Sequence, residues 1–127
     1  MADGVIFTNI MSHLVARLSA ALTARGYPDT RVGIRADESP SQVILRRDGG
    51  TRPSKTLEDS VIGINIYATN YGNAEELALM VSAIFDDLPD GNPITATSVQ
   101  SSIQDVTDLQ GERRFLRFTV TNRGSNL

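Results

Sequence analysis

Val61–Ala68 has the sequence VIGINIYA, the clearest alternation of large apolar with small or polar residues in this chain. Ile62, Ile64 and Ile66 occupy every second position. Successive side chains of a strand point to opposite faces of its sheet, so this alternation predicts a strand within Thr56–Thr69 that buries one face. A sheet with one buried face needs a second layer to cover it, and amphipathic helices commonly form that layer.

Two amphipathic helices are predicted, one on each side of this strand. The first spans about Thr8–Arg25, with an N-cap at Thr8 or Asn9, and the second spans about Asn73–Leu88, with Asn73 as its N-cap. In both, apolar residues recur at spacings of three and four and therefore form one stripe. The two stripes consist of Phe7, Ile10, Met11, Leu14, Val15, Leu18 and Leu22, and of Leu77, Met80, Val81, Ile84 and Leu88.

The remaining segments complete an α+β pattern. Residues 48–55 contain two glycines and a proline, which predicts a hairpin loop, and residues 123–127 are expected to form a frayed tail. The order α-β-β-β-α-β-β predicts a two-layer sandwich, with two helices packed on a mostly antiparallel sheet of four to five strands. We expect a single domain over residues 1–127 with its core at about 8–122. The further predicted strands are Arg31–Arg35, Ser41–Arg47, Ile94–Val106 and Arg113–Asn122.

Composition excludes several kinds of site before any motif is considered. The 127 residues contain no cysteine, which excludes disulfides, thiolate zinc sites, iron–sulfur clusters and cysteine nucleophiles. The net charge of −3 argues against a free-standing nucleic-acid-binding protein, because such proteins are usually basic. No apolar run is long enough for a transmembrane helix, and the N-terminus has no signal-peptide pattern. We therefore expect no membrane association and a location in the cytoplasm of the cell that makes the protein.

Catalytic and metal-binding patterns are not found. His13, the only histidine, lies away from the apolar stripe of its helix and accompanies no nucleophile motif. Asp86, Asp87 and Asp90 resemble the start of a calcium loop. An apolar residue and a threonine nevertheless stand at two ligand positions, so a solvated acidic turn, or a contact with arginines of a neighbouring subunit, is favoured. We expect no enzyme activity, no metal and no cofactor.

Two groups of residues are instead candidates for an interface. Arg46, Arg47, Arg52 and Lys55 form the densest basic cluster, around Gly49–Gly50. A docking hairpin is the first interpretation, a solvated loop the second and a nucleic-acid-binding finger the third, because no aromatic platform lies between Ile44 and Ile66. In the last strand Phe115 and Arg117 share the face opposite the apolar set. A face that combines aromatic and arginine side chains is typical of protein interfaces, and it is equally compatible with an ordinary exposed sheet face.

The order and character of these elements resemble the tail terminator proteins of long-tailed, non-contractile bacteriophages, particularly those of actinobacterial hosts. The resemblance covers about residues 10 to 122 and departs from the family pattern in the long, serine- and threonine-rich region Ile94–Val106. The segments that carry it are Leu14–Leu22 (LVARLSAAL), Val32–Arg35 (VGIR), Val43–Gly50 (VILRRDGG), Val61–Ala68 (VIGINIYA), Tyr67–Asn70 (YATN), Ala74–Ala78 (AEELA) and Arg114–Val120 (RFLRFTV).

The resemblance implies a structural virion protein at the head-proximal end of the tail, assembled in the host cytoplasm. Terminators of this family form a six-membered ring on the tail tube, end its polymerisation and present a surface for head joining. The implied partners are further copies of the chain, the tail tube protein and a head-completion protein, with DNA only passing through the ring. As complementary ring surfaces, the acidic group Asp86, Asp87 and Asp90 would face the arginine hairpin or the last strand of a neighbour. The alternatives are another head–tail connector protein or a nucleic-acid-binding module that uses the hairpin.

Overall fold

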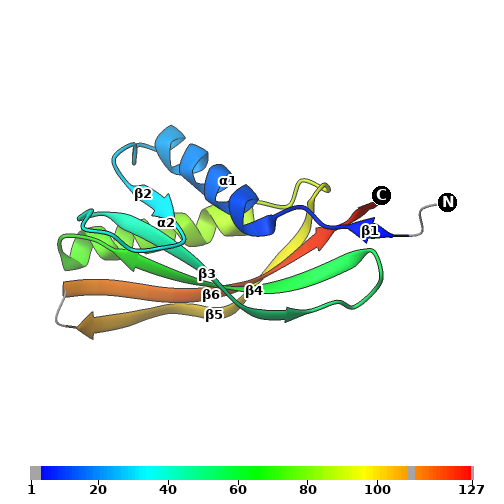
Figure 1. Ribbon diagram of the computed structural model, residues 1–127. Helices are drawn as coiled ribbons and strands as arrows, with labels where there is room; N and C mark the ends of the chain where they lie inside the picture. The colour runs from blue at the N-terminus through cyan, green and yellow to red at the C-terminus, as the bar shows by residue number, and fades with distance from the viewer. Residues whose placement is uncertain (1–3, 109–110, 127) are drawn as a thin grey trace.

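The computed structural model describes residues 4–108 and 111–126 and consists of a helix layer on one face of a sheet (Figure 1). The elements in chain order are β1 (Val5–Ile6), α1 (Ile10–Ala24), β2 (Arg31–Gly33), β3 (Gln42–Thr51), β4 (Leu57–Tyr67), α2 (Tyr71–Asp86), β5 (Ile94–Asp108), β6 (Gly111–Arg123) and β7 (Ser125–Asn126). The predicted order is thus present, with a short strand added at each end.

The main sheet has five strands in the order β2-β3-β4-β6-β5. Only the pair β2–β3 is parallel; β3–β4, β4–β6 and β6–β5 are antiparallel. Both helices lie on the same side of this sheet (Figure 1). The structure therefore confirms the predicted α+β two-layer sandwich.

The core lies between the helices and one face of the sheet, where VIGINIYA supplies its central strand. Ile62, Ile64 and Ile66 are fully buried, and Ile64 stands between Leu45 of β3 and Leu116 of β6. The helices contribute the predicted stripe residues that they contain, together with Phe85, which the predicted stripe omitted. Leu88 joins the core from just beyond α2, whereas Phe7 lies before α1 and outside the core. The Phe85 ring packs against that of Phe118 with ring centroids 5.1 Å apart.

The N-cap was predicted correctly for α1 but not for α2. Asn9 caps α1 and accepts a hydrogen bond from the backbone N–H of Ser12 at 3.2 Å, one of the two predicted choices. The predicted cap of α2 at Asn73 is wrong. Asn70 is the cap, and its side-chain oxygen accepts from the backbone N–H of Asn73 at 2.9 Å. The side-chain oxygen of an N-cap asparagine accepts a hydrogen bond from a backbone N–H two to three residues later, so either asparagine could act as the cap. Because the link from β4 is short, the helix begins after the earlier one.

The hairpin loop is shorter than predicted. Strand β3 continues through Asp48 to Thr51 and β4 begins at Leu57, so only residues 52–56 connect them. The register shifts between Arg47 and Gly49, where a β-bulge is formed and Gly49 has a φ of 138°. At Gly50 a Cβ atom would collide with the backbone carbonyl oxygen of Asp59 on β4. The two glycines thus permit a bulge and a close strand approach, rather than ending the strand.

The C-terminal segment is not a frayed tail. Ser125 and Asn126 form β7 and pair antiparallel with β1, with Ile6 opposite Ser125. Gly124 makes this approach possible, because a Cβ there would collide with the Val5 side chain, and its N–H donates to the Thr56 carbonyl oxygen at 2.9 Å. Leu127 and part of the predicted turn at 108–111 lie outside the described residues.

Candidate interface on the open sheet face

The sheet face opposite the helices contains a row of three residues on neighbouring strands. Arg46 of β3 pairs with Gly63 of β4, which in turn pairs with Arg117 of β6. The adjacent row is Leu45, Ile64 and Leu116, which point toward the helices and are buried. Alternation along each strand therefore places Arg46 and Arg117 on the open face, with the side-chain-free position of Gly63 between them.

Asp48 joins the two arginines across this gap. Its Oδ1 lies 2.6 Å from Nε of Arg46, and its Oδ2 lies 3.0 Å from Nη2 of Arg117. The Arg117 guanidinium also lies over the Phe115 ring, 5.1 Å from its centroid. A Cβ at Gly63 would lie 2.5 Å from Asp48 Oδ2, so only glycine leaves room for the bridge. We call Arg46, Asp48, Phe115 and Arg117 the Asp48 cluster.

The bulge accounts for the orientation of Asp48. Arg47 pairs with Ile62 and Gly49 with Val61, so Asp48 is the extra residue without a partner on β4. A bulge turns a side chain away from its regular alternation, and here it directs the carboxylate over the open face. Only 15% of the Asp48 side chain is exposed, compared with 62% for Arg46 and 34% for Arg117. Two arginines and one aspartate leave the cluster with a net positive charge.

The same contacts shift the ionisation of the cluster. The hydrogen bond from Arg46 is the main reason that the pKa of Asp48 is lowered, with the Arg117 contacts adding to it against the opposing effect of burial. The reciprocal hydrogen bond to Asp48 raises the pKa of Arg46. A carboxylate paired on both oxygens stays ionised at lower pH than a free one. The cluster is therefore a fixed, charged feature at neutral pH.

Asp48→Asn is expected to reduce the dependence of stability on acid pH. A carboxylate whose pKa is lowered by folding stabilises the fold above its unfolded pKa of about 3.9, and this contribution is lost as the pH falls through the folded pKa. Urea midpoints measured between about pH 6 and pH 2 should therefore fall more steeply for the wild type than for the variant. The variant should still lose some stability at acid pH, because the hydrogen bond from the Ser39 backbone N–H also lowers the pKa of Asp37. Equal slopes would contradict this role for Asp48.

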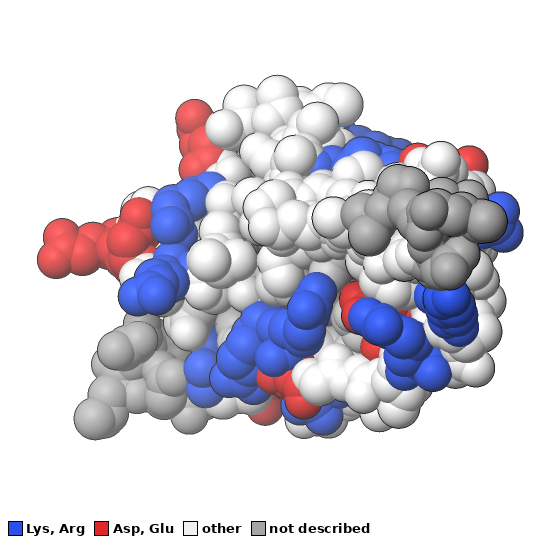
Figure 2. Space-filling model, turned by 45° about the vertical axis from the view of Figure 1, so that its right-hand side comes forward, with Lys and Arg blue, Asp and Glu red and all other residues white. Residues whose placement is uncertain are grey.

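The other predicted basic residues do not join this cluster. Arg52 lies 3.7 Å from Glu58 and over the ring of Phe7, 4.7 Å from its centroid, so it contacts the N-terminal segment. Arg47 and Lys55 are exposed. Figure 2 shows Lys and Arg side chains gathered over the lower part of the molecule, with Asp and Glu side chains between them. The predicted basic group is thus divided between the open sheet face and the hairpin end.

The predicted acidic group lies elsewhere, at the C-terminal end of α2. Asp90 pairs with Arg17 of α1 at 2.8 Å, whereas Asp86 and Asp87 are exposed. Because α2 covers the opposite face of the sheet from the Asp48 cluster, the structure does not bring the predicted acidic and basic groups together within one chain. In residues 4–108 and 111–126, no group of three or more histidine or acidic side chains could hold a metal ion.

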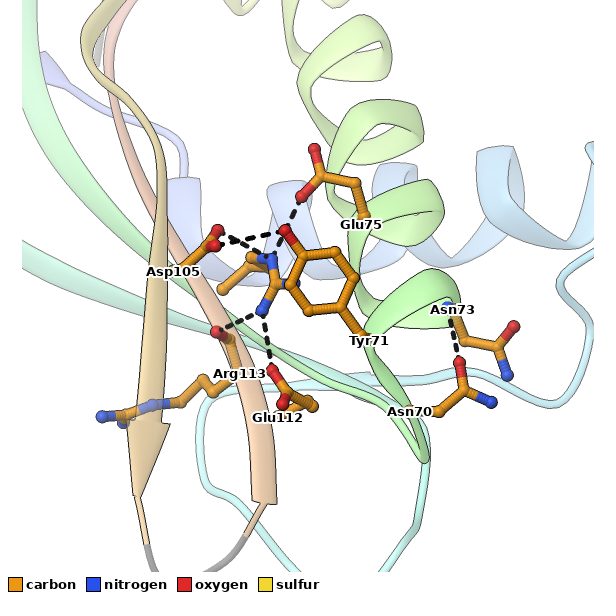
Figure 3. A network of polar contacts seen from close by, with 8 residues as sticks. Asn70, Tyr71, Asn73, Glu75, Asp105, Glu112 and Arg113 are labelled. Atoms are coloured by element: carbon orange, nitrogen blue, oxygen red, sulfur yellow. Dashed lines mark hydrogen bonds and ion pairs between the residues drawn. The ribbon is translucent and has the colours of Figure 1, made fainter.

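The sequence analysis missed a second ionic cluster, centred on Arg114. This side chain is fully buried beneath the start of α2 and lies 3.1 Å from Glu75, 3.1 Å from Asp105 and 3.3 Å from Glu112. Its guanidinium also lies 4.4 Å from the centroid of the Tyr71 ring. Figure 3 shows these side chains converging from α2, β5 and β6. Arg114 occupies the same alternate positions of β6 as the buried residues Leu116, Phe118 and Val120. This spacing is the feature of the sequence from which its burial could have been predicted.

The charge of Arg114 is maintained despite its burial. Burial alone would lower the pKa of its guanidinium, but hydrogen bonds to Glu75 and Glu112 and the charge of Asp105 raise the pKa above its ordinary value. The cluster joins the first turns of α2 to the β5–β6 pair. We therefore assign it a structural role and regard the open sheet face as the candidate interface.

Comparison with known proteins adds no identification. The chain matches no protein-family model and no curated protein. Neither helix of the described chain has the length and apolar character needed to span a membrane.

Proposed function

We propose that this chain is a structural subunit of a phage tail terminator, which forms a ring on the tail tube, ends its polymerisation and offers a surface for head joining. The observation that supports it most is the open sheet face with its Asp48 cluster. Arginine and aromatic residues are enriched in protein interfaces, and the guanidinium of Arg117 stacks on Phe115 within this face. The resemblance of the sequence to tail terminators supplies the biological setting.

The geometry of the cluster suits a docking surface because its parts are already held in place. Arg117 is fixed by the two oxygen–nitrogen contacts to Asp48, at 3.0 and 3.1 Å, and by the Phe115 ring. A side chain that is ordered before binding loses less conformational entropy when a partner docks. The planar guanidinium retains further N–H donors for a carboxylate of that partner. In this proposal the partners are further copies of the chain, the tail tube protein and a head-completion protein.

The proposal is tested by imaging particles produced from a phage genome that lacks this gene. Negative-stain microscopy should show overlong tubes without heads, because polymerisation has lost its stop. Tails of normal length lying free beside full heads would instead assign the protein to the head-side connectors. Normal virions would overturn both assignments, and a DNA-binding assay over a salt series would then test the nucleic-acid alternative, since such binding weakens steeply with salt.

Complementation with variants connects this test to the Asp48 cluster. Arg117→Gln removes the positive charge and the stacking on Phe115, and we expect it to restore normal tails poorly. Arg25→Gln is the matched control, because Arg25 is exposed just after α1 and belongs to neither ionic cluster. Equal rescue by both variants would show that the open sheet face is not the docking surface.

A further inference from the structure

A groove runs between α1 and the edge strand β2, on a part of the molecule that the proposed function has not used. Its volume is about 610 Å³, and its apolar lining includes Met11, Val15 and Ile34. Ile34 is 58% exposed although it is a large apolar residue. Among the described residues, β2 pairs only with β3, so its outer edge is available to another chain.

Two arginines provide the charged part of the groove lining, Arg31 and Arg35. Arg31 is already engaged, since its Nε lies 3.0 Å from Asp37 and its Nη1 donates to the Arg35 carbonyl oxygen at 2.8 Å. Gly33 allows this arrangement, because a Cβ there would lie 2.9 Å from Arg31 Nη2. The exposed Arg35 side chain has no ion-pair partner within the described part of the chain. The groove therefore combines an apolar lining with one available positive charge.

The outer ridge of α2 has the complementary character. Leu79 is 56% exposed, and helical spacing places Glu76 and Asp86 on the same outward side, one before it and one after. Both carboxylates are exposed and make no ion pair among residues 4–108 and 111–126. Helix α2 contains no lysine or arginine, so the ridge is purely acidic and apolar. We call Glu76, Leu79, Ala83 and Asp86 the α2 ridge.

We propose that the α2 ridge of one copy docks into the α1–β2 groove of a second copy. Leu79 would then cover the apolar lining formed by Met11 and Val15, and Glu76 or Asp86 would reach Arg35. Side-chain ridges of one helix commonly pack into grooves on another, and α1 forms one wall of this groove. A second copy is the favoured occupant because the same chain carries both an apolar–basic groove and an apolar–acidic ridge.

The two surfaces share no residue, so one copy can use its ridge and its groove on two different neighbours. Such a heterologous contact propagates from copy to copy and forms a ring when the rotation between copies closes. The inference names a subunit contact and rests on the proposed function only for what the ring does. It differs from the predicted pairing of Asp86, Asp87 and Asp90 with the arginine hairpin or the last strand of a neighbour. Within one chain Asp90 is already bound by Arg17 and Arg46 by Asp48, and Asp86 is here assigned to the groove.

The chain has no cysteine, which permits a direct test by disulfide crosslinking. Ile34→Cys and Leu79→Cys are made in separate full-length proteins, mixed in equal amounts at high concentration and oxidised. We expect a crosslinked dimer that contains one copy of each variant, and a ladder of higher species when a single chain carries both substitutions. Ile6→Cys mixed with Leu79→Cys is the matched control, since Ile6 is equally exposed at 57% but lies on β1.

Charge exchange then tests the specificity of the contact. In the crosslinking background, Arg35→Glu should reduce the 34–79 crosslink at least severalfold, and combining it with Glu76→Arg should restore it. Arg25→Glu, an exposed reversal outside both surfaces, should leave the yield unchanged. A 34–79 yield no higher than the 6–79 control, both in concentrated protein and in purified tails, would overturn the inference.

The outcomes separate this contact from the proposed function. Specific 34–79 crosslinks together with normal virions from the gene-deleted genome would leave the self-association standing and remove the terminator assignment. Overlong tubes without heads, combined with no specific crosslink in tails of the double variant, would support the terminator assignment and place the subunit contact elsewhere.

Discussion

Replacing Arg114 by alanine should lower the free energy of unfolding by about 3–4 kcal/mol. Among the described residues Arg114 has the largest fully buried side chain, so its truncation leaves a cavity beneath α2. The loss also leaves Glu75, Asp105 and Glu112 close together without the cation that holds them. These carboxylates are 30–55% exposed, so water screens their repulsion and the cavity contributes most of the loss. Urea unfolding followed by circular dichroism measures the difference.

Arg114→Met separates the two contributions, because methionine retains most of the buried volume but has no charge. Its loss of stability should be smaller than that of the alanine variant. It should also be partly reversed by about 1 M salt, which shortens the screening length to about 3 Å. The alanine variant should retain its cavity cost under the same conditions. If both variants are as stable as the wild type, the buried ion pairs contribute nothing to the fold.

Phe118→Ala should be similarly damaging, with an expected loss of about 3–5 kcal/mol. The Phe118 ring is fully buried between the sheet and α2 and packs on Phe85, so its removal opens a cavity that the surrounding strands fill only partly. Thermal and urea unfolding should both report the loss, and the variant should also unfold faster, unless the contact is already formed in the folding transition state.

Phe115→Ala is the matched control on the same strand. Phe115 is half-buried on the open face, where its ring contacts the Arg117 guanidinium, so the stability cost should be only about 1 kcal/mol. Under the proposed function, its defect should appear in tail assembly instead. Equal destabilisation by the two substitutions would show that the open face is packed as tightly as the core, and would contradict its assignment as an interface.

The sequence predicted the layers of the fold better than the ends of its elements. Apolar periodicity shows which side of an element is buried, as in the alternation of Ile62, Ile64 and Ile66 and in the helical stripes. The buried side in turn determines how the helices and the sheet are layered. Turn residues are less informative, because Gly49 and Gly50 serve a bulge and a close strand approach as readily as a loop. The β7 pairing was also not predictable, since a two-residue strand has no periodicity of its own.

The candidate interface was predictable only in part. Alternation along the last strand correctly placed Phe115 and Arg117 opposite the core. The participation of Asp48 depends on the bulge, and Gly63 matters only because of cross-strand register, neither of which is visible in a single sequence. Arg114 was overlooked for a different reason: an arginine is expected to be exposed, and this expectation outweighed its position in the buried alternation.

The pairing of β1 with β7 also brings the two ends of the described chain close together in space. Val5 lies opposite Asn126, next to the hairpin, where Arg52 covers Phe7 and Thr56 accepts the Gly124 N–H. A gold particle or fluorophore attached at Val5 or at Ser125 would therefore mark the same corner of the subunit. If the chain forms the proposed ring, such labels would lie on one circle of defined radius. The position of that circle along the tail axis would show which end of the subunit faces the tail tube.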